Sequence, residues 1–368
     1  MIRALLPILL FAPQDPEILR PDPPKVERSG PQWKIGLSAA ADLPDETVVQ
    51  VRLLPVLLRF YEDQASLRWS EMESGQPVRR SVVQQKKLAL RAQLPGLRRL
   101  VVVWSLDPKA QPQGVTLDRG FAPVRSSYLL GSLSDRLKPF RSSLDEPPRL
   151  YSRLLELLKQ MDEIDRSGSD RGIPAWSSSL ASFRHRCDEE ISSGPFTASI
   201  GLLDSVAGDA ATYVSWLKSR RVAEKKPSNS GGSDSENAQN DNPTGDQPPT
   251  GGTSGPTAHG RKDNRDIRSD TAANLRKRLD PFAKLRRAEM LLTLAAEALE
   301  LLEAGKAAPA GPLLDAASLV EGRLKDEKEP LKPLRDALAT LASGDPAMRK
   351  SATDSLKLWE ATTAKLAP

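Results

Sequence analysis

The side chains that most often perform nucleophilic or metal chemistry are scarce in this chain. Its 368 residues include one cysteine, Cys187, and two histidines, His185 and His259. An intrachain disulfide and the usual Cys/His zinc clusters cannot be built from so few ligands. A catalytic pair would need His185 and Cys187 to meet, but residues two apart on a helix point about 200° away from each other. We therefore expect Cys187 to be an ordinary core residue and His259 to be solvated.

Motifs for other reactions are also missing from the sequence. The segment 201–208 has a serine between two glycines, but it lacks the spacing and the preceding strand of a hydrolase nucleophile. The glycine pairs at 231–232 and 251–252 lack the strand, lysine and helix of a phosphate-binding loop. The 48 acidic residues offer no pair that can be assigned to glycoside hydrolysis without geometry. We predict no catalytic residue, no metal ligand and no cofactor.

The densest basic segment spans residues 261–287, where ten Lys or Arg residues against four Asp residues give a net charge of +6. Such a segment could contact an anionic polymer, lipid headgroups or nucleic-acid phosphates. Phe282 is its only aromatic residue, so base stacking is not indicated and nucleic acid is not the expected partner. A solvated helix face is the alternative explanation. The candidate contact residues are Arg261, Lys262, Arg265, Arg268, Arg276, Lys277, Arg278, Lys284, Arg286 and Arg287.

Composition gives only broad limits on class and compartment. A hydrophobic content of 39% supports a folded core, and a net charge of +5 is too small to identify a partner. Met1–Ala12 places a nine-residue apolar stretch after Arg3, the layout of an export signal, so we expect an exported protein of the periplasm or cell surface. A short core helix in a cytoplasmic protein is the alternative. Nine apolar residues are too few to span a bilayer, which takes about 20.

Alternating apolar residues predict the strands of the N-terminal third. The alternation begins at 33–39 and recurs at 47–54, 57–61, 66–70, 82–92 and 97–106. Pro55 is expected to limit the second strand to an edge or a bend. Short strands at this spacing, without a helical period between them, predict an antiparallel β-sandwich. Strand alternation would place several members of a second basic group on the outer face of the sheets: Arg79, Arg80, Lys86, Lys87, Arg91, Arg98 and Arg99.

This third of the chain also resembles a known domain type. The turn and strand at 43–51, the Leu94-Pro95-Gly96 turn and the apolar run 100–103 are similar to those of the small immunoglobulin-like domains of bacterial envelope proteins. The resemblance covers roughly residues 30–125. It implies a sandwich that serves as a spacer or adhesive module, and therefore presentation instead of catalysis.

The apolar period changes to 3.6 after residue 148, which predicts helices. Residues 149–222 carry three helical stripes, and 266–368 carry several more, with Asp345 expected as the N-cap of the last helix. Residues 227–258 contain no large apolar residue, so they predict a disordered tether. We favour two separate helical bundles. The alternative is one bundle into which the tether is inserted, because loop-closure entropy grows only slowly with length.

The expected fold is therefore a multidomain α and β protein, with an N-terminal antiparallel β-sandwich and α-helical bundles separated by a disordered linker. The boundaries are 1–15 for the signal or anchor, 16–31 for a Pro-rich lead, 32–125 for the sandwich, 126–148 for a connector, 149–222 for a helical bundle, 223–265 for the tether and 266–368 for the C-terminal bundle. The expected role is a scaffold that binds a protein partner. The alternatives are a hydrolase with unidentified carboxylates and a binder of anionic polymer through 261–287.

Overall fold

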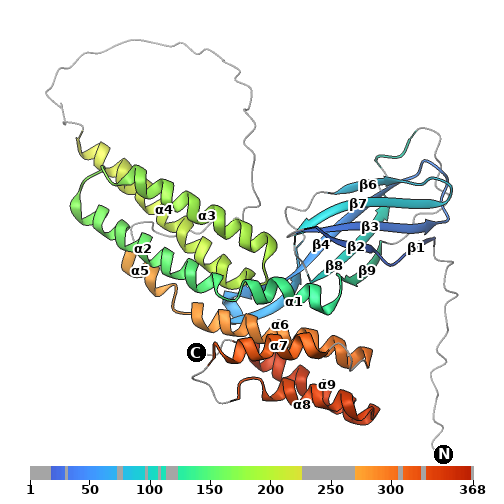
Figure 1. Ribbon diagram of the computed structural model, residues 1–368. Helices are drawn as coiled ribbons and strands as arrows, with labels where there is room; N and C mark the ends of the chain where they lie inside the picture. The colour runs from blue at the N-terminus through green and yellow to red at the C-terminus, as the bar shows by residue number, and fades with distance from the viewer. Residues whose placement is uncertain are drawn as a thin grey trace, which may run out of the picture. The chain divides into compact units, whose positions relative to one another are not determined.

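The computed structural model describes residues 18–29, 32–72, 78–95, 98–106, 109–112, 123–225, 270–305, 310–324 and 329–365. The N-terminal segment 1–15, on which the prediction of export rests, lies outside the described residues. So do His259 and the predicted tether 223–265 beyond Lys225. Within the described residues, antiparallel sheets precede a series of helices, which confirms a mixed α and β chain (Figure 1).

Two antiparallel sheets form the N-terminal part (Figure 1). In the first sheet, β7 pairs along one edge of β3, and β1 and β2 follow one another along its other edge. In the second, β8 and then β9 lie on one side of β4, and β5 and β6 pair with its other edge. The strands are β1 (Leu19–Pro21), β2 (Lys25–Ser29), β3 (Gln32–Ala41), β4 (Val48–Tyr61), β5 (Ser66–Glu71), β6 (Arg79–Val82), β7 (Lys87–Pro95), β8 (Arg99–Leu106) and β9 (Val124–Leu129).

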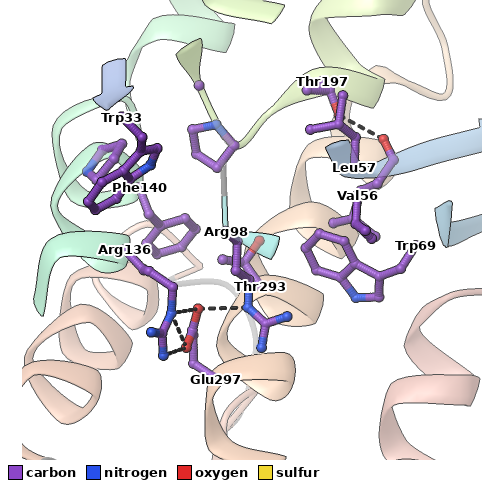
Figure 2. A pocket seen from close by; sticks show the side chains of 14 residues that line it. Trp33, Val56, Leu57, Trp69, Arg98, Arg136, Phe140, Thr197, Thr293 and Glu297 are labelled. Carbon is purple, nitrogen blue, oxygen red and sulfur yellow. Dashed lines mark hydrogen bonds and ion pairs between the residues drawn. The ribbon is translucent and has the colours of Figure 1, made fainter. Parts of the chain in front are cut away.

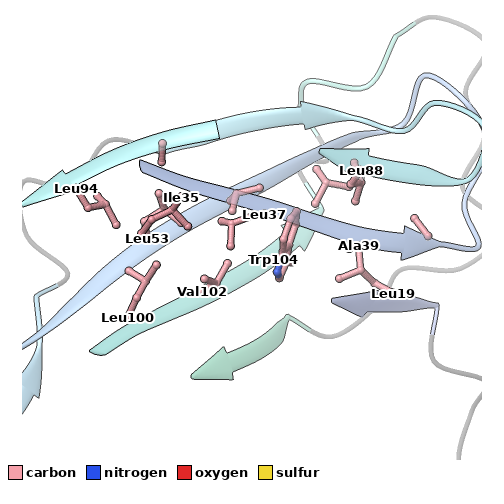
Figure 3. Packing of buried hydrophobic residues seen from close by; sticks show 14 of the residues in the cluster. Leu19, Ile35, Leu37, Ala39, Leu53, Leu88, Leu94, Leu100, Val102 and Trp104 are labelled. Atoms are coloured by element: carbon pink, nitrogen blue, oxygen red, sulfur yellow. The ribbon is translucent and has the colours of Figure 1, made fainter. Parts of the chain in front are cut away.

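Side chains from both sheets share one hydrophobic core. Along β3, Trp33, Ile35, Leu37 and Ala39 are buried and alternate with more exposed residues, as the sequence predicts. They join one cluster with buried residues of β4, β7 and β8, and Figure 3 shows Trp104 of β8 among them. Because strand side chains alternate between faces, this pattern fixes which face of each strand is covered.

The structure corrects the expectation for Pro55. The second and third predicted strands form one continuous strand, β4, with Pro55 in its interior. Pro55 O accepts a hydrogen bond from Met72 N at 2.8 Å. This bond lies on the edge of β4 that pairs with β5 and β6, at the gap between these two strands. The missing N–H of a proline therefore faces this break between two short strands and not the ladder with β8, which is why the strand continues.

The helices mostly follow the predicted stripes. Asp345 accepts from Ala347 N at 2.9 Å and caps α9 as predicted, and α6 ends at Gly305, whose φ of 64° suits a glycine. Within the predicted helical region 266–368, the chain is broken before Pro281 into α5 and α6. The helices are α1 (Leu133–Ser142), α2 (Glu146–Ser167), α3 (Ile173–Ser193), α4 (Thr197–Lys225), α5 (Ala272–Lys277), α6 (Phe282–Ala304), α7 (Ala310–Glu321), α8 (Lys332–Ser343) and α9 (Pro346–Thr363).

The chain divides into two compact units whose limits differ from the predicted domain boundaries. The first unit contains the sheets together with residues 186–202 and 281–368, and the second contains 150–185 and 203–280. In the second unit, Trp176 Nε1 donates to Leu157 O at 2.9 Å and joins α3 to α2, and Arg184 pairs with Asp204 at 2.8 Å to join α3 to α4. No described helix is long and apolar enough to cross a membrane.

Candidate functional site

Helix α6 carries a buried polar stripe. Most of its residues are apolar, and such a helix is buried on nearly all sides. Glu289, Thr293 and Glu297 recur every four residues along it, so they share one face, and they are 0%, 7% and 1% exposed. A buried ionisable side chain is costly unless it has partners, so the partners of these two glutamates decide what this part of the first unit can do.

Two arginines converge on Glu297. Figure 2 shows Arg136 of α1 and Arg98, which immediately precedes β8, approaching its carboxylate from different sides. Arg98 Nε lies 2.7 Å from Oε1, and Arg136 Nη2 lies 2.7 Å from Oε2. Both guanidinium groups also donate to backbone carbonyls, Arg98 to Ala296 O and Arg136 to Gly131 O, each at 2.7 Å. The carboxylate therefore joins β8, α1 and α6 through charge-assisted hydrogen bonds.

The balance of forces keeps Glu297 ionised. Burial alone would raise its pKa, but the positive charges of Arg98 and Arg136 and their hydrogen bonds outweigh burial, and the pKa of Glu297 is lowered. A carboxylate held in this way is a poor proton donor or acceptor near neutral pH. The neighbouring Glu300 of α6 pairs with Arg99, the next residue along the chain from Arg98, so the network extends along the helix.

The space beside this network is too small for an organic substrate. The cavity has a volume of about 40 Å³. It can hold only a few water molecules, because a single water molecule needs about 10–15 Å³ of such free volume. Trp33, Trp69 and Phe140 contribute aromatic walls (Figure 2). Phe140 also stacks on Phe196, with ring centroids 5.7 Å apart. The arrangement is suited to holding elements together.

Glu289 has different partners. Its Oε1 and Oε2 accept the N–H groups of Ala198 at 2.6 Å and Ser199 at 3.1 Å, in the first turn of α4. A glutamate of one helix thus caps the N-terminus of another, where the helix dipole favours negative charge. Burial nevertheless dominates and raises the pKa of Glu289 to about 7, against the hydrogen bonds from Ser199 and Ala198.

A larger hollow lies between β5 and the C-terminal half of α9, and we call it the β5–α9 groove. Its volume is about 380 Å³, which falls within the usual range for small-molecule sites. Leu58 of β4, Leu67 of β5 and Leu292 of α6 supply apolar lining, and each is almost fully buried. Trp69 of β5 lines both this groove and the smaller cavity.

Glu360 of α9 is the one carboxylic acid among the residues that line the β5–α9 groove. Burial raises its pKa, although the positive charge of Arg98, the nearby indole N–H of Trp69 and the charge of Lys357 act in the opposite direction. A perturbed carboxyl in a hollow is a usual sign of a functional site. A glycosidase would need a second carboxyl group, and the described lining does not provide one.

The structure describes only part of the predicted basic site. Arg261, Lys262, Arg265 and Arg268 lie outside the described residues. Arg276, Lys277 and Arg278 belong to the second unit, whereas Lys284, Arg286 and Arg287 belong to the first. Arg278 forms an ion pair with Asp209, and the half-buried Arg286 donates to Leu144 O at 3.1 Å. These two side chains therefore have structural partners, and binding of an anionic polymer through the segment stays a prediction.

Arg98, a member of the second basic group, does not lie on an outer face, because its side chain is only 13% exposed and pairs with Glu297. The rule of strand alternation does not apply to it because it lies just outside β8. Cys187 is buried, as predicted for a core residue, and His185 is exposed. The sequence analysis missed Glu289 and Glu297. Their spacing of eight within the mostly apolar stretch 288–299 was the available clue, because polar residues in such a stretch cannot all reach solvent.

Comparisons with protein families, with curated proteins and with solved structures find no match to this chain. Among the described residues, no group of three or more His, Cys, Asp or Glu side chains is placed to hold a metal ion. The interpretation of function therefore depends on the geometry of the site itself.

Proposed function

We propose that the chain is a non-catalytic scaffold that binds a protein partner, in which an immunoglobulin-like sandwich and attached helices present surfaces. The observation that carries the proposal is the Glu297 network. The ionisable groups that converge there are fully engaged with one another beside a cavity of about 40 Å³. The arginines come from α1 and from the residue that precedes β8, and the carboxylate comes from α6, so the network holds the sheets and helices of the first unit in a fixed arrangement.

Exposed apolar side chains on the helices of the first unit offer surfaces for a partner. Leu358 of α9 is 71% exposed and Met348 of the same helix is 50% exposed. On α7, Leu314 and Leu319 are each more than one third exposed. Single exposed apolar residues are normal, but interfaces use such side chains as anchors when a partner covers them. The helical faces are therefore the first surfaces to probe.

Site-specific photo-crosslinking tests the proposal. A photoreactive amino acid is placed at Leu358, and the full chain is irradiated in the cells from which the sequence comes. The matched control places the same group at Lys34, an exposed polar position on β3. The proposal expects one discrete protein adduct from Leu358 and none from Lys34. Absence of any adduct from Leu314, Met348 and Leu358 in turn would contradict it.

A specific observation favours a hydrolase as the second candidate, namely the raised pKa of Glu360 in a groove of substrate size. The groove offers one carboxyl group and no second one among its described lining. The test is turnover of ester, glycoside and phosphodiester substrates by the full chain and by Glu360→Gln. The scaffold expects no turnover above buffer. Turnover that is lost on Glu360→Gln would establish the enzyme instead.

A further inference from the structure

The β5–α9 groove has the chemistry of a ligand site that the proposed scaffold function does not use. Its lining is divided into two kinds of surface. Leu58, Leu67 and Leu292 lie in one buried hydrophobic cluster, which gives the groove an apolar floor. The cationic side chains among the lining residues, Arg68, Lys357 and Lys365, are exposed.

Two buried polar atoms of lining residues, Ser66 Oγ and Trp69 Nε1, make no hydrogen bond with any described residue. Ser66 as a whole is only 5% exposed. A buried hydroxyl without a hydrogen bond costs free energy, so such an atom next to a hollow indicates a missing polar group. Together with three cations against the single acid Glu360, it favours a ligand with an anionic, hydrogen-bonding head.

The shape of the groove favours a small molecule over an extended peptide. Leu67 N donates to Ala364 O at 2.8 Å, and Ser66 forms a β-bridge with Lys365. The chain therefore already pairs with one end of the free edge of β5, which blocks the continuous pairing that an added strand would need. A volume of about 380 Å³ suits a ligand of about ten to fifteen heavy atoms better than a peptide segment.

We propose that the β5–α9 groove binds an aliphatic monocarboxylate of medium chain length. The hydrocarbon chain lies in the groove against Trp69, Ala361 and Ala364, above the buried leucines. The carboxylate lies at the rim near Lys357 and Lys365. Trp69 forms one wall of the groove. Its ring is held in place by the Arg98 guanidinium, which lies 5.5 Å from the ring centroid. Burial of the chain supplies the affinity, and the cations select the sign of the head group.

Isothermal titration calorimetry of the full chain with decanoate, kept below its micelle concentration, tests the proposal. Decanoate is expected to bind with one molecule per chain. Decyltrimethylammonium, which has the same tail and the opposite charge, is expected to bind at least tenfold more weakly. Butanoate, which keeps the head and loses six methylene groups, is expected to bind at least a hundredfold more weakly. No saturable binding of decanoate, or equal binding of the cationic probe, would overturn the proposal.

Three variants locate the binding site. Ala361→Trp fills the groove from an exposed position of α9, so it should remove binding without changing the melting temperature. Lys357→Glu reverses a rim charge and should weaken binding at least tenfold; it also serves if Ala361→Trp fails to fold. Lys350→Glu is the matched control, because Lys350 is exposed on the same helix and does not line the groove. Unchanged decanoate binding by folded Ala361→Trp or Lys357→Glu would overturn the proposal.

Discussion

Two glutamates on α6 are buried to the same extent and yet differ in ionisation. Glu297 meets two guanidinium groups, and its pKa is lowered. Glu289 meets the backbone N–H groups of Ala198 and Ser199, and burial raises its pKa to about 7. The comparison shows that hydrogen bonds and a helix terminus do not replace the hydration of a buried carboxylate, whereas two full positive charges do.

The two regions therefore respond differently to pH. At neutral pH Glu297 is a fixed charge that joins β8 and α1 to α6, and its contribution to stability is lost only in acid. Glu289 holds the start of α4 to α6 and changes its ionisation close to neutral pH. If partner charge, and not burial, separates the two regions, removing each carboxylate should have different effects on stability.

The largest effect is expected from removing the charge of Glu297. Glu297→Gln keeps the size of the side chain but leaves Arg136 as a buried cation without an anion, and leaves Arg98 with only the more distant Glu300 carboxylate, 3.7 Å away. Loss of one member of a buried ion pair costs about 3–5 kcal/mol, so the free energy of unfolding at pH 8 should fall by about that amount. Urea denaturation followed by circular dichroism measures it.

Glu289→Gln is the matched control at pH 8. The same change eight residues earlier on α6 removes an ionised carboxylate that lacks a cation, so it should be neutral or stabilising. If both variants lose the same free energy of unfolding, burial and not partner charge dominates, and the comparison fails.

The second effect is a pH dependence that belongs to Glu289. Its pKa is about 7 in the folded chain against 4.5 as the ordinary value. Between these values the folded state holds a proton that the unfolded state has released, so the free energy of unfolding falls as pH rises. The difference corresponds to about 3 kcal/mol across this window, at about 1.4 kcal/mol per pKa unit. Well above pH 7, Glu289 is ionised in both the folded and the unfolded chain, so its contribution to the free energy of unfolding should no longer change with pH.

Urea unfolding of the wild type and of Glu289→Gln is measured between pH 4.5 and 8. The variant is needed because burial also raises the pKa values of other carboxyl groups, among them Glu190 and Glu360, which contribute to the wild-type curve. The wild-type curve minus the Glu289→Gln curve should slope downward with rising pH. Parallel curves would mean that Glu289 does not titrate in this window.

The sequence predicts elements better than it predicts these partners. Alternation at Trp33–Ala39 identifies β3 because a strand with one covered face must alternate, and Asp345 identifies the start of α9 because a cap is a local interaction. The continuous β4 was missed because the effect of Pro55 depends on where neighbouring strands end, which is set by pairing far along the chain.

The Glu297 network was also missed because its partners lie far apart along the chain. Arg98 lies about 200 residues from Glu297, and no local pattern connects them. The units also differ from the predicted domains because residues 186–202 contact α6 through Glu289. The i, i+4 spacing of Glu289, Thr293 and Glu297 could be recognised in the sequence, but their partners come only from tertiary packing.

A smaller effect is expected from Thr197, which also anchors the start of α4 but does not titrate. Thr197 Oγ1 donates to Leu58 O of β4 at 2.7 Å. Thr197→Val removes this hydrogen bond and should lower the free energy of unfolding by about 1 kcal/mol. The loss should be the same at pH 5 and pH 8, measured by urea denaturation.

Thr212→Val is the control for this change. Thr212 lies on the same helix, is exposed, and bonds only to Gly208 O within its own helix at 3.1 Å. Its loss should stay within about 0.5 kcal/mol. A loss at Thr197 that varies with pH would show that the effect is transmitted through Glu289 instead of through the bond to β4.

The smallest effect is expected for an ion pair that has charge complementarity without burial. Lys86 and Asp42 lie 3.2 Å apart, but their side chains are 76% and 72% exposed. Water hydrates both charges in either state, so a double-mutant cycle with Lys86→Gln and Asp42→Asn should give a coupling below about 0.5 kcal/mol that decreases with added salt. The same cycle with Arg136→Gln and Glu297→Gln should give a larger coupling that salt changes little, because these groups are enclosed. Similar couplings for the two pairs would show that solvent reaches Glu297, and that its ionisation reflects hydration instead of its arginine partners.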